Sequence, residues 1–249
     1  MLKPIVKLLI SPIIILQGLY VKRVTPRLPE AKGERSGISL SSTESQASES
    51  EGQAETSLLV LGDSAAAGVG VEHQSEALLG HILDNINEQT VRWQLLANTG
   101  DNCAQLLKKA EAFHQQDKDL DFQHVVISIG VNDVTGSTPI KVWVDNLTKL
   151  INVLQHDFNA QKIYFSALPP MHAFPALPQP LRWLLGQRAV VLNKVLRKLV
   201  AQQANCFMVE ASFPLEQGFI ADDGFHPGAD AYKLWGTHVA QMVKLELSS

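Results

Sequence analysis

The sequence is poor in cysteine, in basic clusters and in long apolar runs, and each shortage excludes a class of protein. It contains two cysteines, Cys103 and Cys206, and no C-x-x-C pair. This pattern indicates neither a zinc site nor a disulfide framework, although a single bridge between the two stays open. The formal net charge is −4 and no basic block occurs, so nucleic acid is not an expected partner.

The first 35 residues differ in composition from the rest of the chain. An apolar run from Leu8 to Tyr20 is flanked on both sides by lysine or arginine. It is short for a bilayer span, and no small-residue cleavage site follows it. We therefore expect residues 2–27 to act as an uncleaved anchor or an interfacial helix on a membrane surface. Packing of this helix on the folded domain is the alternative. If the segment spans, the basic residues after it favour a cytoplasmic location for the folded domain.

Residues 36–56 are rich in serine and glutamate and contain no aromatic side chain. Such a segment buries too little apolar surface to offset the entropy of ordering it. The sequence therefore predicts a flexible tether here and a folded domain over residues 57–249. At 45% hydrophobic residues, the chain has the composition for one sizeable core in that domain.

Apolar strands alternate with helical patterns throughout the predicted domain. Strands are expected at Leu58–Leu61, Trp93–Ala97, His124–Ile129, Lys162–Ser166 and Cys206–Val209. Helices are expected at Ser75–Asn87, Ala104–His114, Ile140–Phe158, Leu181–Gln203 and Ala229–Leu247. This alternation predicts an α/β fold, with a parallel five-stranded sheet between two helical layers in a three-layer α/β/α sandwich.

The first predicted strand leads directly into Gly62-Asp63-Ser64. Ser64 then lies at the carboxyl end of a buried strand, where open α/β sheets bind ligands. A serine at this position is suited to nucleophilic chemistry, provided that a base activates it. Taken alone, the tripeptide is equally compatible with Ser64 as a helix N-cap.

His226 is the best candidate for that base among the eight histidines. It follows Asp223 by three residues, across a turn that Gly224 permits, so that one loop supplies both an imidazole and a carboxylate to orient it. A metal site from Asp222, Asp223 and His226 is an alternative, but it would need further ligands at a recognisable spacing.

Two further strand-end loops offer hydrogen-bond donors for a developing oxyanion. Gly100 follows the second predicted strand and can present its backbone N–H at close range. Asn132 follows the third and carries a side-chain amide. Each of the two is also compatible with an ordinary turn or cap.

These blocks together resemble the SGNH hydrolases, also called the GDSL esterase/lipase family. The resemblance rests on Gly62-Asp63-Ser64, Gly100, Gly130-x-Asn132-Asp133 and Asp223-x-x-His226, in that order. It implies a flavodoxin-like sandwich and a serine esterase. In it, Ser64 would be the nucleophile, His226 the base and Asp223 its partner. Backbone N–H groups of Ser64 and Gly100 and the Asn132 amide would form the oxyanion hole. No cofactor or metal is implied. Ala65 stands where the family name expects leucine.

The segment Ala167–Pro178 is apolar and rich in proline, and it follows the fourth predicted strand. With Trp183 it is a candidate wall for an acyl pocket, or else a loop packed on its own domain. We expect a small-molecule or lipid ester with a short to medium acyl chain as substrate. Lysophospholipids, thioesters and acetylated carbohydrates are alternatives, as is a non-catalytic module that binds lipid or glycan.

Overall fold

A single six-stranded sheet forms the centre of the molecule. The computed structural model describes residues 4–41, 56–86, 90–210, 216 and 218–247. The strands are β1 (Ser36–Ser39), β2 (Thr56–Gly62), β3 (Val91–Ala97), β4 (His124–Ser128), β5 (Lys162–Ser166) and β6 (Cys206–Val209). Their order is β1-β3-β2-β4-β5-β6, and only β1 is antiparallel to its neighbour. The loop that carries Ser64 thus follows a central strand, β2.

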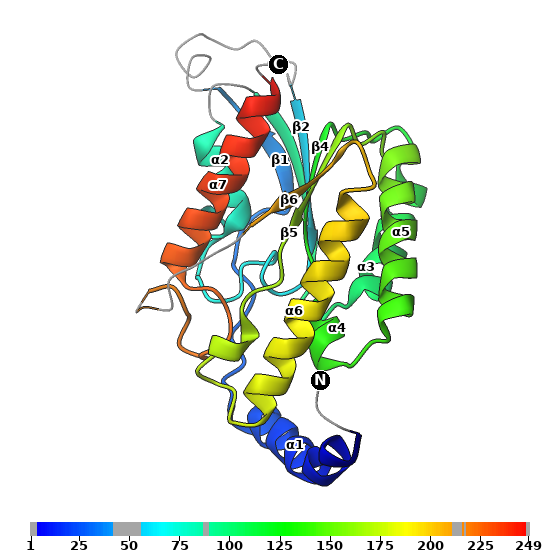
Figure 1. Ribbon diagram of the computed structural model, residues 1–249. Coiled ribbons are helices and arrows are strands. Elements are labelled where there is room, and N and C mark those ends of the chain that lie inside the picture. The colour runs from blue at the N-terminus through cyan, green and yellow to red at the C-terminus, as the bar shows by residue number, and fades with distance from the viewer. Residues whose placement is uncertain (1–3, 42–55, 87–89, 211–215, 217, 248–249) are drawn as a thin grey trace.

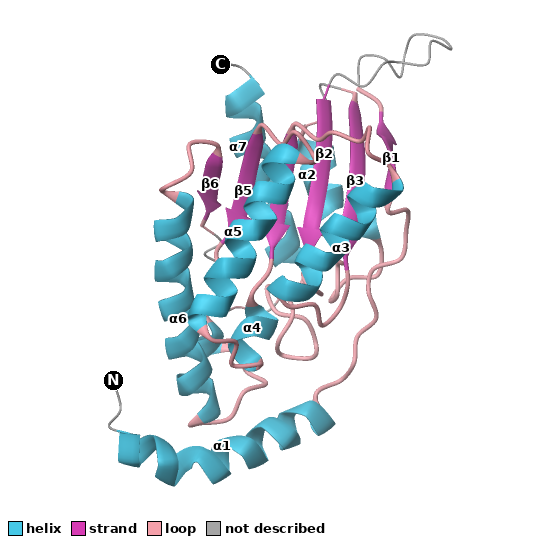
Figure 2. Cartoon of the chain, turned by 90° about the vertical axis from the view of Figure 1, so that its right-hand side faces the viewer, coloured by secondary structure: helices cyan, strands magenta, loops and turns pink. Residues whose placement is uncertain are grey.

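Helices cover both faces of this sheet. The helices of the described residues are α1 (Pro4–Val24), α2 (Leu78–Asn85), α3 (Cys103–Gln116), α4 (Val131–Thr135), α5 (Ile140–His156), α6 (Leu181–Val200) and α7 (Ala229–Leu247). Leu59 and Leu61 belong to a core with α3, α5 and α6, whereas Leu58 and Val60 belong to a core with α2 and α7. Alternate side chains of a strand face opposite sides. The result is the three-layer sandwich seen in Figures 1 and 2.

The predicted α/β architecture is confirmed, with additions. All five predicted parallel strands are present, and helices α2, α3, α5, α6 and α7 occupy the predicted regions. α2 begins only at Leu78, because Gln74–Glu76 forms a separate 3-10 turn. Strand β1 and the five-residue helix α4 were not predicted. The sheet is therefore mixed and six-stranded, where the sequence predicted five parallel strands.

Strand β1 corrects the expectation of a flexible tether over residues 36–56. Ser36–Ser39 pairs antiparallel with Val91–Gln94 of β3 at the edge of the sheet. Its side chains are half-buried or exposed, so the short strand has no apolar pattern to reveal it. Residues 42–55 of the expected tether lie outside the described residues.

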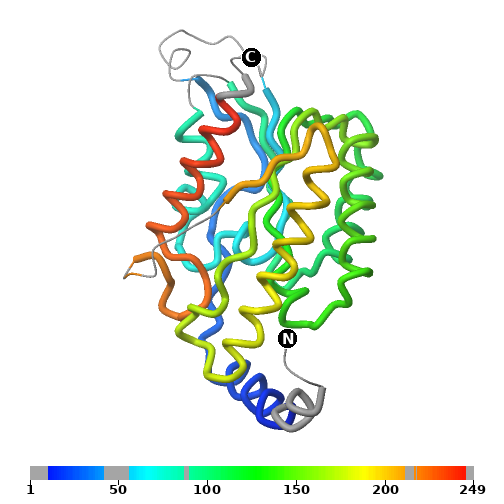
Figure 3. Tube along the Cα trace, in the orientation of Figure 1, coloured from blue at the N-terminus to red at the C-terminus, as the bar shows by residue number. Residues whose placement is uncertain are grey.

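Helix α1 lies at the end of the molecule where the parallel strands finish, and the chain then runs back to β1 (Figure 3). It packs on the domain through Gln17, whose Nε2 donates to Gln179 O at 2.6 Å and whose Oε1 accepts from Leu181 N–H at 3.1 Å. Ile14 and Val21 contact the larger core. No helix in the described part of the chain combines the length and apolarity needed to cross a bilayer. The expected spanning anchor is thus not supported.

Both cysteines are buried free thiols, so the bridge that the sequence left open does not form. Cys103 begins α3 and Cys206 begins β6. Burial raises the pKa of the Cys206 thiol to about 11 and also raises that of Cys103. Both groups therefore act as small apolar side chains at neutral pH.

Candidate active site

The register of the sheet brings three predicted site loops to one place. Gly62, the last residue of β2, is paired with Ala97 on one side and Ser128 on the other. Ser64 follows two residues after Gly62, and Gly100 and Asn132 follow three and four residues after their own paired positions. A Cβ on Gly62 would lie 2.3 Å from the Ser128 carbonyl oxygen, so only glycine permits this close spacing.

Ser64, His226 and Asp223 form a continuous chain of hydrogen-bonding atoms. The Nε2 atom of His226 lies 2.9 Å from Ser64 Oγ. Its Nδ1 atom lies 2.5 Å from Asp223 Oδ2. The loop between β6 and α7 thus presents an imidazole to the serine and a carboxylate to the imidazole, although Ser64 is 162 residues away in sequence.

The Asp223 carboxylate is fixed from both sides. Its side chain is 1% exposed. Its Oδ1 atom accepts the backbone N–H groups of Phe225 and His226, each at 2.9 Å. Burial by itself raises the pKa of Asp223, but the hydrogen bonds from His226 and Phe225 outweigh burial and hold the pKa below its usual value. The carboxylate is therefore ionised at neutral pH and can orient an imidazolium.

Asp63 is a second buried carboxyl group beside the serine, and its pKa is shifted in the opposite direction to that of Asp223. Its Oδ1 atom accepts the Ala65 N–H at 3.2 Å, and its Oδ2 atom has no partner among the described residues. Burial raises the pKa of Asp63 to about 7, opposed by the Ala65 N–H and by His226. No role was predicted for Asp63 from the sequence.

The candidate oxyanion donors lie on adjoining segments. Asn132, in α4, donates from Nδ2 to the Asp101 carbonyl oxygen at 2.8 Å, which joins α4 to the loop that carries Gly100. Gly100 has a φ of +89°, which favours glycine. Among the described residues, the N–H groups of Ser64 and Gly100 have no protein acceptor.

Asp133, the residue after Asn132, makes a second connection between these two segments. Its Oδ2 atom accepts the Cys103 N–H at 2.9 Å, at the first residue of α3. Asp133 is 1% exposed, and burial raises its pKa above the usual value despite these hydrogen bonds. The Asp133 contact explains why the residue after Asn132 is a carboxylate: it fixes the start of α3 beside Asn132.

A cavity of about 80 Å³ opens beside Ser64 and His226. Its apolar wall includes Leu168, Pro169 and Phe174 of the proline-rich segment, as the sequence predicted. Phe225 adds to this wall and packs edge-on against Phe174, with ring centroids 5.0 Å apart. Trp183 is not part of the wall, because it lies on the outer surface of α6 with 39% of its area exposed.

Other lining residues were missed by sequence reasoning. Phe219 and Ile220 come from the segment before Asp223, and Trp235 comes from α7. Trp235 Nε1 donates to Ser166 Oγ at 3.1 Å, which fixes its ring at the cavity floor. The signal available for Phe219 and Phe225 was their position close to the predicted base.

The metal alternative is not supported by the arrangement of these side chains. Asp222 is exposed, while Asp223 is engaged with His226. Within the described residues, no group of three histidine, cysteine, aspartate or glutamate side chains is placed to hold a metal ion.

An α/β/α sandwich with serine, histidine and carboxylate on loops that follow parallel strands is an arrangement found in ester hydrolases. The chain belongs to the GDSL-like lipase/acylhydrolase family, which matches residues 60–234. It is accordingly an ester-bond hydrolase by family, and the resemblance inferred from the four sequence blocks is confirmed. No curated protein matches the chain at a significant level.

Solved structures of similar fold include esterases from several organisms. The psychrotrophic esterase EstA from Pseudoalteromonas sp. is 19% identical with a TM-score of 0.56, and the match covers 78% of this chain and 100% of that one. A carbohydrate esterase family 2 enzyme from Corynascus thermopiles is 13% identical with a TM-score of 0.63, covering 81% and 69%. A G-D-S-L family protein from Veillonella parvula is 14% identical with a TM-score of 0.61, covering 76% and 98%. At these identities the likeness concerns the fold.

Proposed function

We propose that the protein hydrolyses carboxylic esters with a short to medium acyl chain through a Ser64 acyl-enzyme. The observation that carries this proposal is the unbroken contact from Asp223 through His226 to Ser64 Oγ, at 2.5 and 2.9 Å. Spacings of this kind are those expected of a nucleophile, its base and the group that orients the base.

The proposed reaction proceeds in two halves. His226 Nε2 takes the Ser64 proton as Oγ bonds to the ester carbonyl carbon. The tetrahedral intermediate collapses, the C–O bond to the alcohol breaks, and the alcohol leaves with the proton from His226. In the second half, His226 takes a proton from water, the hydroxide attacks the acyl-enzyme, and Ser64 leaves with that proton to release the acid. The ionised Asp223 stabilises the imidazolium in both halves.

The oxyanion in this mechanism is bound by Ser64 N–H, Gly100 N–H and the Asn132 amide. The two backbone groups have no acceptor among the described residues. Asn132 Nδ2 has two protons, and the bond to Asp101 O uses one of them. Because donors held in place before the reaction need not reorganise, each contributes to the rate rather than to substrate binding.

The cavity volume argues for a small acyl group. Pockets for drug-sized ligands enclose about 300–1,000 Å³, whereas this cavity has about 80 Å³. Its wall of leucine, proline and phenylalanine has no ionisable side chain apart from Asp63 and His226. Such a wall suits a short aliphatic chain better than a sugar.

Activity toward a series of p-nitrophenyl esters from acetate to dodecanoate tests this proposal. The full-length protein should prefer the short members, and Ser64→Ala should lower kcat at least about a thousandfold. Unchanged activity in Ser64→Ala would refute the assignment of the nucleophile. Inertness of both proteins, and of Ser64 toward a fluorophosphonate probe, would favour a non-catalytic binding module.

Carbohydrate O-acetylesterase activity is the second candidate, because an acetyl group suits so small a cavity and the similar structures include carbohydrate esterases. Acetylated xylose and cellobiose should be compared with p-nitrophenyl butyrate and hexanoate. Faster turnover of the sugars would assign the enzyme to this class. Lysophospholipid and acyl-thioester substrates belong in the same comparison.

We further propose that α1 attaches the enzyme to an anionic membrane surface. Its outward side exposes Ile13, Leu16, Tyr20 and Val24 at helical spacing. Exposed basic residues, Lys22, Arg23 and Arg27, follow at the C-terminal end. Sedimentation with vesicles containing phosphatidylglycerol tests the proposal. Leu16→Glu should abolish sedimentation, and equal sedimentation of the variant would contradict it.

A further inference from the structure

The segment between α1 and β1 is the part of the fold that sequence reasoning placed outside the hydrolase. We call residues 25–35 the N-terminal arm. The arm leads from α1 back to β1 (Figure 3), and residues within it contact the loops that follow β2 and β3. Its contacts to those loops are specific and polar. The arm therefore contacts the candidate site although it lies outside residues 60–234, which match the family.

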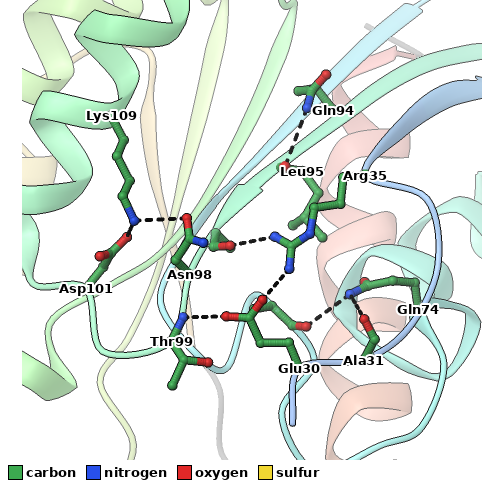
Figure 4. Close-up of polar contacts among 12 residues, drawn as sticks. Glu30, Ala31, Arg35, Gln74, Gln94, Leu95, Asn98, Thr99, Asp101 and Lys109 are labelled. Carbon is green, nitrogen blue, oxygen red and sulfur yellow. Dashed lines mark hydrogen bonds and ion pairs between the residues drawn. The ribbon is translucent and has the colours of Figure 1, made fainter.

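One set of contacts holds the loop that carries Gly100. Glu30 Oε1 accepts the backbone N–H of Thr99 at 2.6 Å. Its other carboxylate oxygen pairs with Arg35 Nη2, and Arg35 Nη1 donates to the Ala97 carbonyl oxygen at 2.6 Å (Figure 4). Ala97 is the last residue of β3. The pair thus bridges the strand end and the residue immediately before Gly100.

A second set of contacts joins the arm to the turn that follows Ser64. Ala31 N–H donates to Ala67 O at 3.2 Å, three residues after the serine. The buried Gln74 side chain donates from Nε2 to both Ala31 O and Ala67 O, at 3.2 and 3.0 Å. One short segment therefore contacts the nucleophile turn and the oxyanion loop together.

The opposite side of the oxyanion loop has contacts of its own. Lys109 Nζ lies 2.5 Å from Asp101 Oδ2 and 2.9 Å from Asn98 Oδ1 (Figure 4). These two contacts hold the ends of the loop but do not reach the Thr99–Gly100 peptide. The Asn98–Thr99 peptide is held at both of its polar groups: Asp101 N–H donates to Asn98 O at 3.3 Å, and Glu30 accepts the Thr99 N–H, so that the plane of this peptide depends in part on the arm.

We propose that Glu30 and Arg35 are positioning residues that set the orientation of the Gly100 N–H in the oxyanion hole. The proposal rests on the proposed function. Gly100 has a φ of +89°, and a Cβ built on it would meet nothing within 4 Å, so this side of the residue faces open space. The Glu30 carboxylate restrains Gly100 through the adjacent residue.

The charge state of Glu30 is consistent with this role. Burial raises the pKa of its carboxyl group, but the Thr99 hydrogen bond and the Arg35 guanidinium outweigh burial and lower the pKa below its usual value. Hydrogen bonds to an ionised acceptor are shorter and stronger than neutral ones. The contact to Thr99 is therefore maintained throughout the pH range in which an ester hydrolase works.

Steady-state kinetics of full-length Glu30→Ala and Glu30→Gln test the proposal. A misplaced donor affects the transition state rather than substrate binding, so kcat of Glu30→Ala should fall about 10- to 100-fold while KM changes less than about twofold. Glu30→Gln should recover part of kcat, because its amide oxygen still accepts the Thr99 N–H. Glu210→Ala is the matched control: it removes an exposed carboxylate that pairs with Arg197, away from these loops, and should keep full kcat.

Unfolding in urea, measured on the same variants, separates positioning from general stability. A wild-type kcat in Glu30→Ala would overturn the proposal, as would a loss of kcat that only matches the unfolded fraction. If Glu30→Ala does not fold, the Glu30→Gln and Arg35→Gln variants take its place, and wild-type kcat in both overturns the proposal. Failure of the proposed function is recognised differently, by a Ser64→Ala protein as active as the wild type.

Discussion

The two sides of the Ser64 hydroxyl group are held by different kinds of structure. On the base side, Asp223 and His226 lie three residues apart on one loop, and Asp223 accepts two backbone N–H groups from that same loop. On the proposed oxyanion side, the Gly100 loop is held by Glu30 and Arg35, which lie 69 and 62 residues from their partners in sequence. The contacts that hold His226 are short-range in sequence and buried, whereas the contacts that hold the Gly100 loop are long-range in sequence and half-exposed.

This difference determines what a sequence can reveal. A loop that contains both a base and its orienting acid has a short spacing that can be recognised. A loop held by a distant arm has no such spacing, since Glu30 and Arg35 are ordinary charged residues near prolines. Substitutions at Asp223 and His226 should therefore affect the chemical step directly, whereas substitutions at Glu30 and Arg35 should affect it through the position of the Gly100 loop.

The largest effect is expected from Asp223→Asn. The amide keeps the shape of the side chain but cannot stabilise the imidazolium and favours the wrong imidazole tautomer, so kcat should fall about 10⁴-fold. Pre-steady-state acylation with p-nitrophenyl acetate measures this directly. A loss below tenfold would show that Asp223 does not orient His226 in the reaction.

Asn132→Ala should have the next largest effect. Loss of one oxyanion donor lowers kcat by about 10²–10³-fold and leaves KM nearly unchanged. The substitution also removes the contact to Asp101 O, so the urea midpoint must be measured alongside. A rise in KM with an unaltered kcat would place Asn132 in ground-state binding and contradict the oxyanion role.

A chain that begins at Ser57 should lose about 10- to 100-fold in kcat, as Glu30→Ala does, because it lacks the arm. It also lacks β1 and so exposes the edge of β3, which favours aggregation. A chain that begins at Thr25 keeps both elements and omits α1, and it should retain full kcat. Equal activity in the two truncated chains would show that the arm is dispensable.

Asp63→Asn should have the smallest effect on rate and a clear effect on the pH dependence of stability. With its pKa raised to about 7, the folded protein keeps a proton on Asp63 that the unfolded chain releases near pH 4. The free energy of unfolding therefore falls as pH rises between these values. From pH 5 to pH 8, Asp63→Asn should gain about 2–3 kcal/mol relative to wild type. Parallel urea-midpoint curves for the two proteins would contradict this.

The sequence predicted the sheet and most of its helices because β2, β4 and β5 are continuous apolar runs buried on both faces. It missed β1, whose Ser-Gly-Ile-Ser sequence has no such pattern, and α4, which is only five residues long. These short elements are fixed by tertiary contacts rather than by local propensity.

For the site, sequence alone proposed Ser64, His226, Asp223, Gly100 and Asn132, and the structure places all five at the same edge of the sheet, Asn132 in the short helix α4 and the others on loops. It did not indicate the arm, because the Glu30–Thr99 contact exists only after β3 has joined the sheet. It also wrongly included Trp183 in the cavity wall, since a large aromatic residue at the start of a helix gives no sign of which way it faces.

The separation in sequence between contacting residues also bears on how the molecule is made. The serine meets its histidine across 162 residues, and the oxyanion loop meets its glutamate across 69. Pairings at such distances carry a high loop-closure cost and form late in folding. Every residue up to His226 must therefore have left the ribosome before His226 can contact Ser64. On the proposed mechanism, a molecule without that contact would contain a serine with no activating base, and hydrolytic activity should be among the last native properties to emerge.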